Sequence, residues 1–486
     1  MILNPTNVRI IHRIHKLYFR QLFPILRIPN DTLKAPMKEK NGFFKYEGVN
    51  YLLPFILITS CFALWGFAND VTNPMVKAFS KIFRMSGTQG TLTQVAFYGG
   101  YFAMALPAAI FIRRFSYKSG ILMGLGLYAA GAFLFIAARS TGSYWPFLAA
   151  YFILTCGLSF LETSANPYIL AMGDPATATR RLNFAQSFNP IGSLCGMFVA
   201  MNFIQARLNP MDSAERATLS DAEFEVMKQS DLGILIKPYV AIGIVILIIF
   251  LVILLVKMPK VKEESSTSIG ASLRRIISLP RYREGVLAQF FYVGVQIMCW
   301  TFIIHYGTRI FTERGMSEIN AEVMSQKYNI VAMIIFCCSR FICTYLMKYF
   351  KPGKMLYCFA IAGFLFTLGV IFFQGIEGLW CLVAVSACMS LMFPTIYGIA
   401  LEGLGEDAKF GAAGLIMAIL GGSVLPPFQA MIIDKGYEYI NHENGEVELV
   451  YRTFLDTPIL NLSFILPMLC FVIIAIYGIR VHRKVI

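Results

Sequence analysis

The chain alternates between long apolar runs and short polar loops. Each apolar run is long enough to cross about 30 Å of hydrocarbon as a helix that rises about 1.5 Å per residue. Transmembrane β-barrels instead show alternating segments of about ten residues. The pattern therefore predicts an all-α membrane protein with twelve transmembrane helices, near residues 52–77, 90–112, 120–138, 145–173, 182–205, 235–256, 285–305, 328–347, 355–374, 378–401, 411–433 and 458–479.

Composition supports this interpretation. The chain is 57% hydrophobic and 14% charged, whereas a soluble protein carries about 25% charged residues. The net charge of +14 is interleaved with apolar runs, so it indicates membrane topology rather than nucleic-acid binding. The eleven cysteines lie in the apolar runs, where they are typical of small core residues rather than of a disulfide framework.

The loops alternate in charge along the chain. The basic loops include 113–118, 257–283, 348–354 and the C-terminal end, and two long acidic loops near 212–231 and 438–456 fall between them. Because Lys and Arg concentrate in cytoplasmic loops, we expect a multi-pass protein with both termini in the cytoplasm.

A Ser-rich polar linker divides the chain into two halves. We expect a basic cytoplasmic N-terminal tail at 1–50, a six-helix bundle at 51–256, a cytoplasmic linker at 257–283, a second six-helix bundle at 284–480 and a cytoplasmic tail at 481–486. Within the N-terminal tail, residues 1–36 contain no spanning run and are expected to be disordered or a wrongly assigned start.

The two halves echo each other weakly. GLSFLETSANPYILAMG in the fourth run corresponds in place to ACMSLMFPTIYGIALEG in the tenth, roughly 230 residues later. Two similar six-helix halves related by an axis along the membrane normal are typical of transporters, with the site between them.

Glu162, in the motif LETSANP, is the only charged residue between Arg139 and Asp174. A carboxylate there costs roughly 2.5–3.5 kcal/mol to insert, and about 18 Å of helix separates it from Asp174. A structural carboxyl bonded to another helix is the alternative to a functional one. Burial disfavours the charged form, which suits such a carboxyl to binding and releasing a proton near neutral pH.

Polar residues also line up inside other apolar runs. Asn69 and Asp70 lie four and three residues before Asn73 in the first run, so these side chains share a helix face. Asp70 could instead lie at the outer interface. Amides with aromatic side chains are typical of sugar sites, since amides donate and accept hydrogen bonds and rings cover apolar sugar faces. Hydrogen bonding between helices is the alternative. The candidate substrate-binding residues are Asn69, Asp70, Asn73, Asn166, Gln186, Asn189, Gln289, Tyr292, Gln296, Trp300 and Phe393.

Enzyme chemistry finds no support in the sequence. We find no nucleophile–base pair, metal-ligand cluster or phosphate-binding Gly loop, which are the marks of an enzyme site. We therefore expect a transporter without cofactors rather than an enzyme.

These motifs together resemble the L-fucose permease branch of the major facilitator superfamily, the fucose–galactose–glucose:proton symporters. The resemblance covers about residues 50–480 and rests on LWGFAND (64–70), AFYGGYF (96–102), LETSANP (161–167), LNFAQSFN (182–189), LAQFFYVGVQ (287–296) and FPTIYGIALEGLG (393–405). It implies two six-helix bundles, alternating access and proton-driven sugar uptake across a bacterial inner membrane.

The resemblance also implies roles for particular residues. The family's fourth-span carboxylate falls on Glu162, and its first-span carboxylate falls on Asn73, while Asp70 occupies the place of a family Asn. The acid and the amide have thus exchanged positions relative to the family, and the two positions are about 4.5 Å apart along the helix axis. Gln186 and Asn189 match family residues near the sugar, and Phe393 supplies the aromatic beside the tenth-span proline.

We therefore expect a monomeric proton-coupled sugar symporter in the lipid bilayer, with L-fucose or a related monosaccharide as substrate. Glu162 is expected to carry the coupling proton, with Asp70 as a second candidate. The alternatives are a carrier for another hexose or solute, sodium coupling, an exporter, or a sugar sensor that does not transport.

Overall fold

The computed structural model describes residues 43–46, 48–85, 92–209, 211, 216, 218–259, 268–441 and 447–484. The expectations for residues 1–36 fall outside these ranges. Within them, twelve helical segments are long and apolar enough to cross a membrane, which confirms the predicted number. Eight spans are single helices: α2 (Leu52–Ile82), α4 (Leu92–Arg114), α5 (Tyr117–Thr141), α6 (Tyr144–Ala171), α10 (Asp221–Leu255), α12 (Pro280–Glu313), α13 (Glu318–Leu346) and α14 (Pro352–Phe372).

The other four spans are interrupted. The fifth contains 3-10 helix Pro175–Thr177, α7 (Ala178–Gln186), α8 (Asn189–Val199), π-helix Ala200–Ile204 and 3-10 helix Gln205–Arg207. The tenth contains α15 (Ile376–Met389) and α16 (Met392–Leu401). The eleventh contains 3-10 helix Gly405–Asp407, α17 (Ala408–Met417), 3-10 helix Ala418–Leu420 and α18 (Gly421–Asp434), and the twelfth contains α19 (Ile459–Leu462) and α20 (Ile465–His482).

Several helices extend beyond the apolar runs. The apolar pattern predicts a start at 235 for the sixth span, whereas α10 begins at Asp221. Ser220 and Glu223 form a reciprocal capping box there, which satisfies backbone N–H groups at the helix start. The polar first turns of α10 therefore project beyond the apolar segment.

Short strands and one further helix lie outside the spans. Three antiparallel pairs form: β1 (Lys45–Tyr46) with β2 (Val49–Asn50), β3 (Tyr437–Asn441) with β4 (Val447–Tyr451), and β5 (Thr453–Phe454) with β6 (Thr457–Pro458). In the longest pair, Tyr437 is opposite Tyr451. The linker contains helix α11 (Ile269–Ser278), which the sequence reading did not predict.

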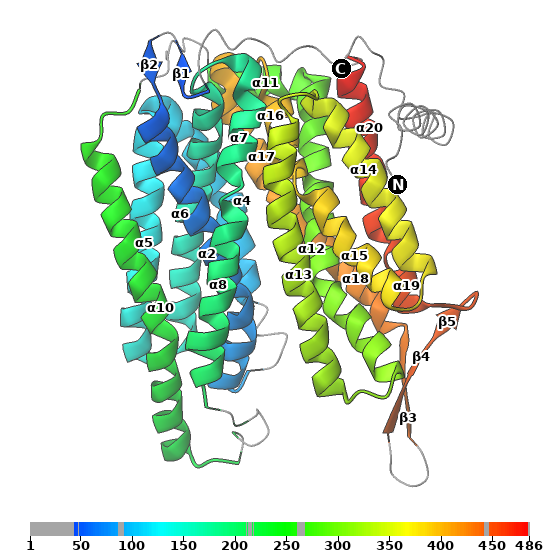
Figure 1. Cartoon of the computed structure of the whole chain (residues 1–486). Coiled ribbons are helices and arrows are strands. Elements are labelled where there is room, and N and C mark those ends of the chain that lie inside the picture. The colour runs from blue at the N-terminus through cyan, green and yellow to red at the C-terminus, as the bar shows by residue number, and fades with distance from the viewer. Residues whose placement is uncertain are drawn as a thin grey trace, which may run out of the picture. The chain divides into compact units, whose positions relative to one another are not determined.

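The spans form two groups within one compact unit, Asn41–Ile486. Helices that precede α11 lie on one side and those that follow it lie on the other, with α4 and α17 between them (Figure 1). Helix α11 and the C-terminal end of α20 lie at one end of the bundles, and the β3–β4 hairpin lies at the opposite end. This is the architecture of two six-helix bundles expected from the sequence.

The internal repeat is visible in the broken helices. A 3-10 turn begins at Pro175 before α7, and another begins at Gly405 before α17, a separation of 405 − 175 = 230 residues. Both spans are then interrupted again, between α7 and α8 and between α17 and α18. The equivalent breaks occur at the same place in each half, as expected for a repeat.

Side chains of the two halves contact each other at the end of the bundles that carries α11. The Asn183 side-chain amide on α7 donates to the Thr395 hydroxyl on α16 at 3.2 Å. The Lys409 ammonium lies 5.1 Å from the centre of the Tyr117 ring, and the Arg113 guanidinium lies 5.3 Å from that of Phe410. These contacts close this end of the boundary between the halves.

Helices α2 and α8 pack with their backbones almost in contact. A Cβ atom added at Gly192 would lie 1.8 Å from the Ala63 carbonyl oxygen, and one at Gly66 would lie 2.0 Å from the Asn189 carbonyl oxygen. Only residues without a Cβ atom permit this approach. It brings the polar end of α2 beside the start of α8 and so sets the position of the site.

Candidate functional site

A cavity of about 100 Å³ lies between the two halves. The first half contributes Trp65, Asn69, Asp70, Phe97, Tyr98, Tyr101, Glu162, Gln186, Asn189, Pro190 and Ser193. The second half contributes Tyr292, Val293, Gln296, Ile297, Trp300, Met333, Phe336, Arg340, Phe393 and Ile419. Segments far apart in the sequence thus share one cavity.

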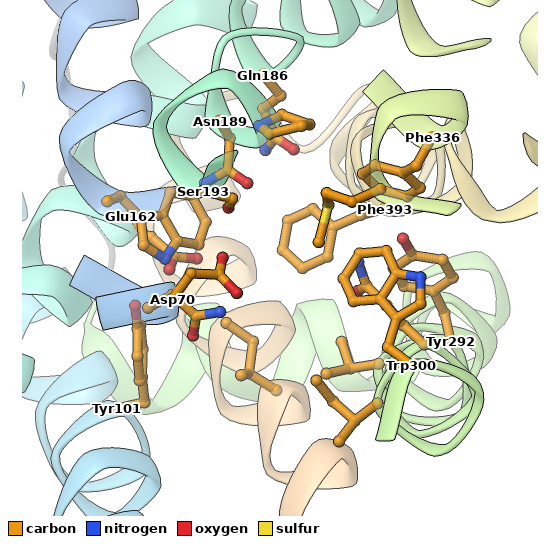
Figure 2. A pocket seen from close by; sticks show the side chains of 18 of the residues that line it. Asp70, Tyr101, Glu162, Gln186, Asn189, Ser193, Tyr292, Trp300, Phe336 and Phe393 are labelled. Atoms are coloured by element: carbon orange, nitrogen blue, oxygen red, sulfur yellow. The ribbon is translucent and has the colours of Figure 1, made fainter. Parts of the chain in front are cut away.

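The two walls differ in chemistry. Asp70, Tyr101 and Glu162 lie on one side, and Tyr292, Trp300, Phe336 and Phe393 lie on the other (Figure 2). Both acidic side chains come from the first half, whereas each half contributes four aromatic side chains. A ligand with hydroxyl groups on one face and C–H groups on the other matches such a cavity.

Glu162 lies in α6 with 1% of its surface exposed. Neither of its carboxylate oxygens forms a close hydrogen bond with the described residues, and the group that interacts with it is the Tyr101 hydroxyl of α4, which lines the same cavity. A buried polar group without a partner carries a desolvation cost. Glu162 is thus a buried carboxyl of the cavity wall, with the Tyr101 hydroxyl of α4 beside it.

A chain of hydrogen bonds leads from the Glu162 turn of α6 to the second half. The Asn166 amide donates to the Glu162 backbone carbonyl at 3.1 Å, and the Gln186 amide donates to the Asn166 side-chain oxygen at 2.7 Å. The Arg340 guanidinium on α13 donates to the Gln186 backbone carbonyl at 3.1 Å. The helix that carries Glu162 is thus connected to the opposite bundle through side chains.

Asp70 and Asn69 lie on α2, directly beside Ser193 of α8 in the cavity wall. The Asn189 side-chain amide donates to the Phe62 backbone carbonyl at 3.2 Å and so joins the same two helices. Asp70 therefore faces the cavity, and the alternative position at the outer interface does not describe it.

The aromatic wall is fixed by its own contacts. The Trp300 indole N–H donates to the Ser386 hydroxyl at 3.2 Å, and the Tyr292 hydroxyl donates to the Met389 carbonyl at 3.2 Å. Trp300 meets Phe336 edge-to-face with ring centres 4.9 Å apart. Phe393 meets Trp65 of the other half in the same way at 6.3 Å.

Arg340 is the charged site residue that the sequence did not lead us to predict, and Trp65, Tyr101, Ser193 and Phe336 also line the cavity without having been predicted. Arg340 is 3% exposed, its Nε donates to the Ser390 carbonyl, and its guanidinium lies 4.5 Å from the centre of the Phe336 ring. It has no carboxylate within ion-pair distance in the described part of the chain. The signal was present, because Arg340 is the only charged residue between Lys327 and Lys348, and charges inside spans usually mark function.

Two predicted residues lie outside the cavity lining, and the side chain of a third is not described. Asn166 and Gln289 are fully buried and do not line the cavity. Asn166 supports Gln186 from behind, while the Gln289 amide has no hydrogen-bond partner in the ranges described. Asn73 belongs to α2, but its side chain lies outside the described part of the structure.

Comparison with known proteins agrees with this geometry. Residues 57–427 match the family model of the Major Facilitator Superfamily. The L-fucose-proton symporter of Haemophilus influenzae is 53% identical over 440 residues, which cover 89% of this chain and 97% of the relative. The L-fucose-proton symporter of Escherichia coli is 34% identical over 390 residues, which cover 79% and 88% of the two chains.

A solved structure matches the whole architecture. The crystal structure of FucP in the outward conformation superposes with a TM-score of 0.77 at 32% identity, covering 89% of this chain and 99% of that one. The chain thus belongs to the Major Facilitator Superfamily, as a member of its L-fucose permease-like branch.

Proposed function

We propose that this protein is a proton-coupled symporter that imports L-fucose or a related monosaccharide by alternating access. The observation that carries the proposal is the buried Glu162 carboxyl, which lines a polar and aromatic cavity beside the Tyr101 hydroxyl. The names of the Haemophilus and Escherichia relatives support the sugar and the proton as substrates.

The sugar binds between the two walls. Asn69, Asp70, Gln186, Asn189 and Gln296 supply donors and acceptors for its hydroxyl groups. Trp300 and Phe393 cover its apolar face, beside Tyr292. Asn166 acts through Gln186, whose amide it orients. A 6-deoxy sugar suits this arrangement, because its methyl group can lie against the aromatic wall.

Glu162 carries the proton. When protonated it is neutral, so its presence in the closed cavity costs less than that of a carboxylate. Release of the proton on the cytoplasmic side restores the charge and favours opening and sugar release there. The chain of hydrogen bonds through Asn166 and Gln186 to Arg340 gives the second half a contact with the helix that carries this carboxyl.

The halves move against each other around this site. The moving units are the bundles of residues 51–256 and 284–480, and linker 257–283 connects them. The contacts of Asn183, Lys409 and Arg113 with the opposite half close the α11 end of the boundary. The cavity is then accessible from the opposite end, consistent with the outward conformation of the solved relative.

The carrier acts as a monomer in the bacterial inner membrane with both termini in the cytoplasm. The arrangement of charge supports this orientation. Arg113, Arg114 and Lys118 lie at the same end as α11, and Asp221, Glu223 and Glu225 lie at the opposite end of the first half. Basic residues favour the cytoplasmic side.

The test is uptake of labelled L-fucose by proteoliposomes that contain the purified protein. An imposed inward proton gradient should drive accumulation, and a protonophore should abolish it. Accumulation that depends on a sodium gradient and not on pH would refute proton coupling. A panel of unlabelled sugars identifies the preferred substrate by competition.

Counterflow separates transport from mere binding. Vesicles loaded with unlabelled fucose should take up labelled fucose without any proton gradient. Binding without counterflow would identify a sugar sensor and overturn the proposal, as would counterflow with apolar drugs but not with sugars.

A further inference from the structure

An apolar groove of about 360 Å³ runs beneath the linker helix α11. Its lining includes Leu106 of α4, Ile276 and Ile277 of α11, Val286 of α12, and Phe410 and Met417 of α17. Elements from both halves and from the linker therefore meet around one apolar space. Arg283 of α12 contributes the basic side chain at this groove.

Helix α11 has the pattern of a helix that lies on a membrane surface. Its buried side is held against the second half by Ser272 and Ile276. Ile269 and Ile277 are 41% and 55% exposed on the adjoining apolar surface, while Arg274 is exposed on the polar surface. Amphipathic helices with basic polar faces lie in the interfacial region with their apolar faces in the acyl boundary.

The arginines around this groove outnumber the carboxylates that pair with them. Arg275 pairs with Asp407 at 2.5 Å, Arg281 lies 3.8 Å from Glu402, and Arg480 pairs with Glu284 at 2.9 Å. Arg274 and Arg283 have no acidic partner among the residues that the structure describes. The Arg283 guanidinium thus remains available at the groove, and that of Arg274 remains available on the polar surface of α11.

We propose that this groove binds an anionic phospholipid of the cytoplasmic leaflet. One acyl chain occupies the apolar space beneath α11, and the phosphate accepts hydrogen bonds from Arg283, with Arg274 adding charge. Guanidinium forks match phosphate geometry, and basic pockets between transmembrane helices on the cytoplasmic side bind anionic headgroups.

The position of the groove gives the lipid a role beyond anchoring. Leu106 belongs to the first half, and Val286 and Phe410 belong to the second. A lipid held here touches both bundles close to the contact of Arg113 with Phe410. Its occupancy therefore depends on how the halves are arranged, and transport rate should depend on the anionic lipid content of the membrane.

Native mass spectrometry of the full-length protein tests the binding. Phosphatidylglycerol and phosphatidylethanolamine with identical acyl chains are titrated separately, without sugar. We expect preferential retention of phosphatidylglycerol, weakened about five-fold by Arg283→Gln and further by the double variant with Arg274→Gln. Lys348→Gln, an exposed charge at the same end and away from the groove, should leave retention unchanged.

Substitutions on α11 test whether an acyl chain occupies the apolar groove. Ile277→Gln should reduce retention, whereas Ile269→Gln, on the same helix but outside the groove, should not. All of these side chains are exposed, so a fluorescence melting curve should show folded protein for every variant. Any one of three results would overturn the proposal. The two lipids could be retained equally, R283Q and K348Q could lose phosphatidylglycerol retention equally, or I277Q could retain as much as the wild type.

Discussion

The Arg340 guanidinium on α13 and the Gln186 backbone carbonyl on α7 form a 3.1 Å hydrogen bond between the two halves of the protein. Gln186 in turn contacts Asn166, whose amide holds the turn of Glu162. Through Gln186 and Asn166, the bond therefore connects the helix that carries Glu162 to the second half. A change at Arg340 should affect coupling as well as sugar binding.

Arg340→Gln should slow fucose counterflow ten-fold or more in folded protein. A hydrogen bond to a charged group contributes about 1.5–3 kcal/mol, and Gln cannot reach both carbonyls that Arg340 contacts. Arg340→Lys should recover part of the rate, because it keeps the charge without the planar fork.

Arg139→Gln is the matched control for Arg340. Arg139 also donates to a backbone carbonyl, that of Gln229 at 3.3 Å, but both residues belong to the first half. Its counterflow rate should stay near that of the wild type. A wild-type rate in R340Q would show that the bond between the halves does not contribute to transport.

Glu162→Gln should separate exchange from accumulation. The variant keeps the shape of a protonated carboxyl but cannot lose the proton, so counterflow should persist while accumulation driven by a pH gradient disappears. The pH dependence of sugar binding should flatten as well. As a control, Glu402→Gln changes an exposed acid at the α11 end and should accumulate fucose normally. Full accumulation by E162Q would show that Glu162 does not carry the coupling proton.

Asp70→Asn should weaken fucose binding by about ten-fold, the effect expected for loss of a hydrogen bond to a charged acceptor. Isothermal titration measures it directly. Adding Asn73→Asp should restore part of the affinity, because the family resemblance places a carboxylate at that position. Unchanged affinity in D70N would show that the sugar does not contact this acid.

Gly192→Ala should disturb the site through packing. The new methyl group would lie 1.8 Å from the Ala63 carbonyl oxygen, so α8 must move away from α2 together with Asn189 and Ser193. Overpacking costs about 1–3 kcal/mol, and both the melting temperature and sugar affinity should fall. Gly99→Ala, where no atom lies within 4 Å of the added Cβ, should change the melting temperature far less.

Asp231→Asn should loosen the long loop between α8 and α10. The Arg216 guanidinium and the Asp231 carboxylate lie 2.7 Å apart, and both side chains are almost completely buried. Removing one partner of a buried pair costs about 3–5 kcal/mol, so limited proteolysis of this loop should accelerate. Glu225→Gln removes an exposed pair with Lys228 and should leave the cleavage rate nearly unchanged.

The sequence predicted the spans and Glu162 because both depend on the cost of polar groups in hydrocarbon. The same rule applies to Arg340, the only charged residue between Lys327 and Lys348, whereas its contacts with backbone carbonyls of both halves depend on the packing of distant segments. Helix α11 escaped prediction because its ten residues lie in a polar linker, where no long apolar run marks a helix.

Helical periodicity identified which side chains share a helix face, but not which helix or cavity that face meets. Gln289 shares a stripe with Tyr292 and Gln296, yet only the latter two reach the cavity. Asn166 follows Glu162 by one turn, yet its amide is used on a backbone carbonyl and on Gln186. Which residue on a face meets empty space depends on how the opposing helix packs, and that information is distributed over both halves.

The repeated helix breaks lead to a consequence for specificity. Gln186 and Asn189 flank the break in the fifth span, and Ile419 lies in the corresponding break of the eleventh, so both breaks reach the cavity. The break in the fifth span thus brings amide side chains to the cavity, whereas the break in the eleventh brings the apolar Ile419. A polar side chain at position 419 should therefore add a hydrogen-bonding group to the second half of the cavity wall and change which cargo is accepted.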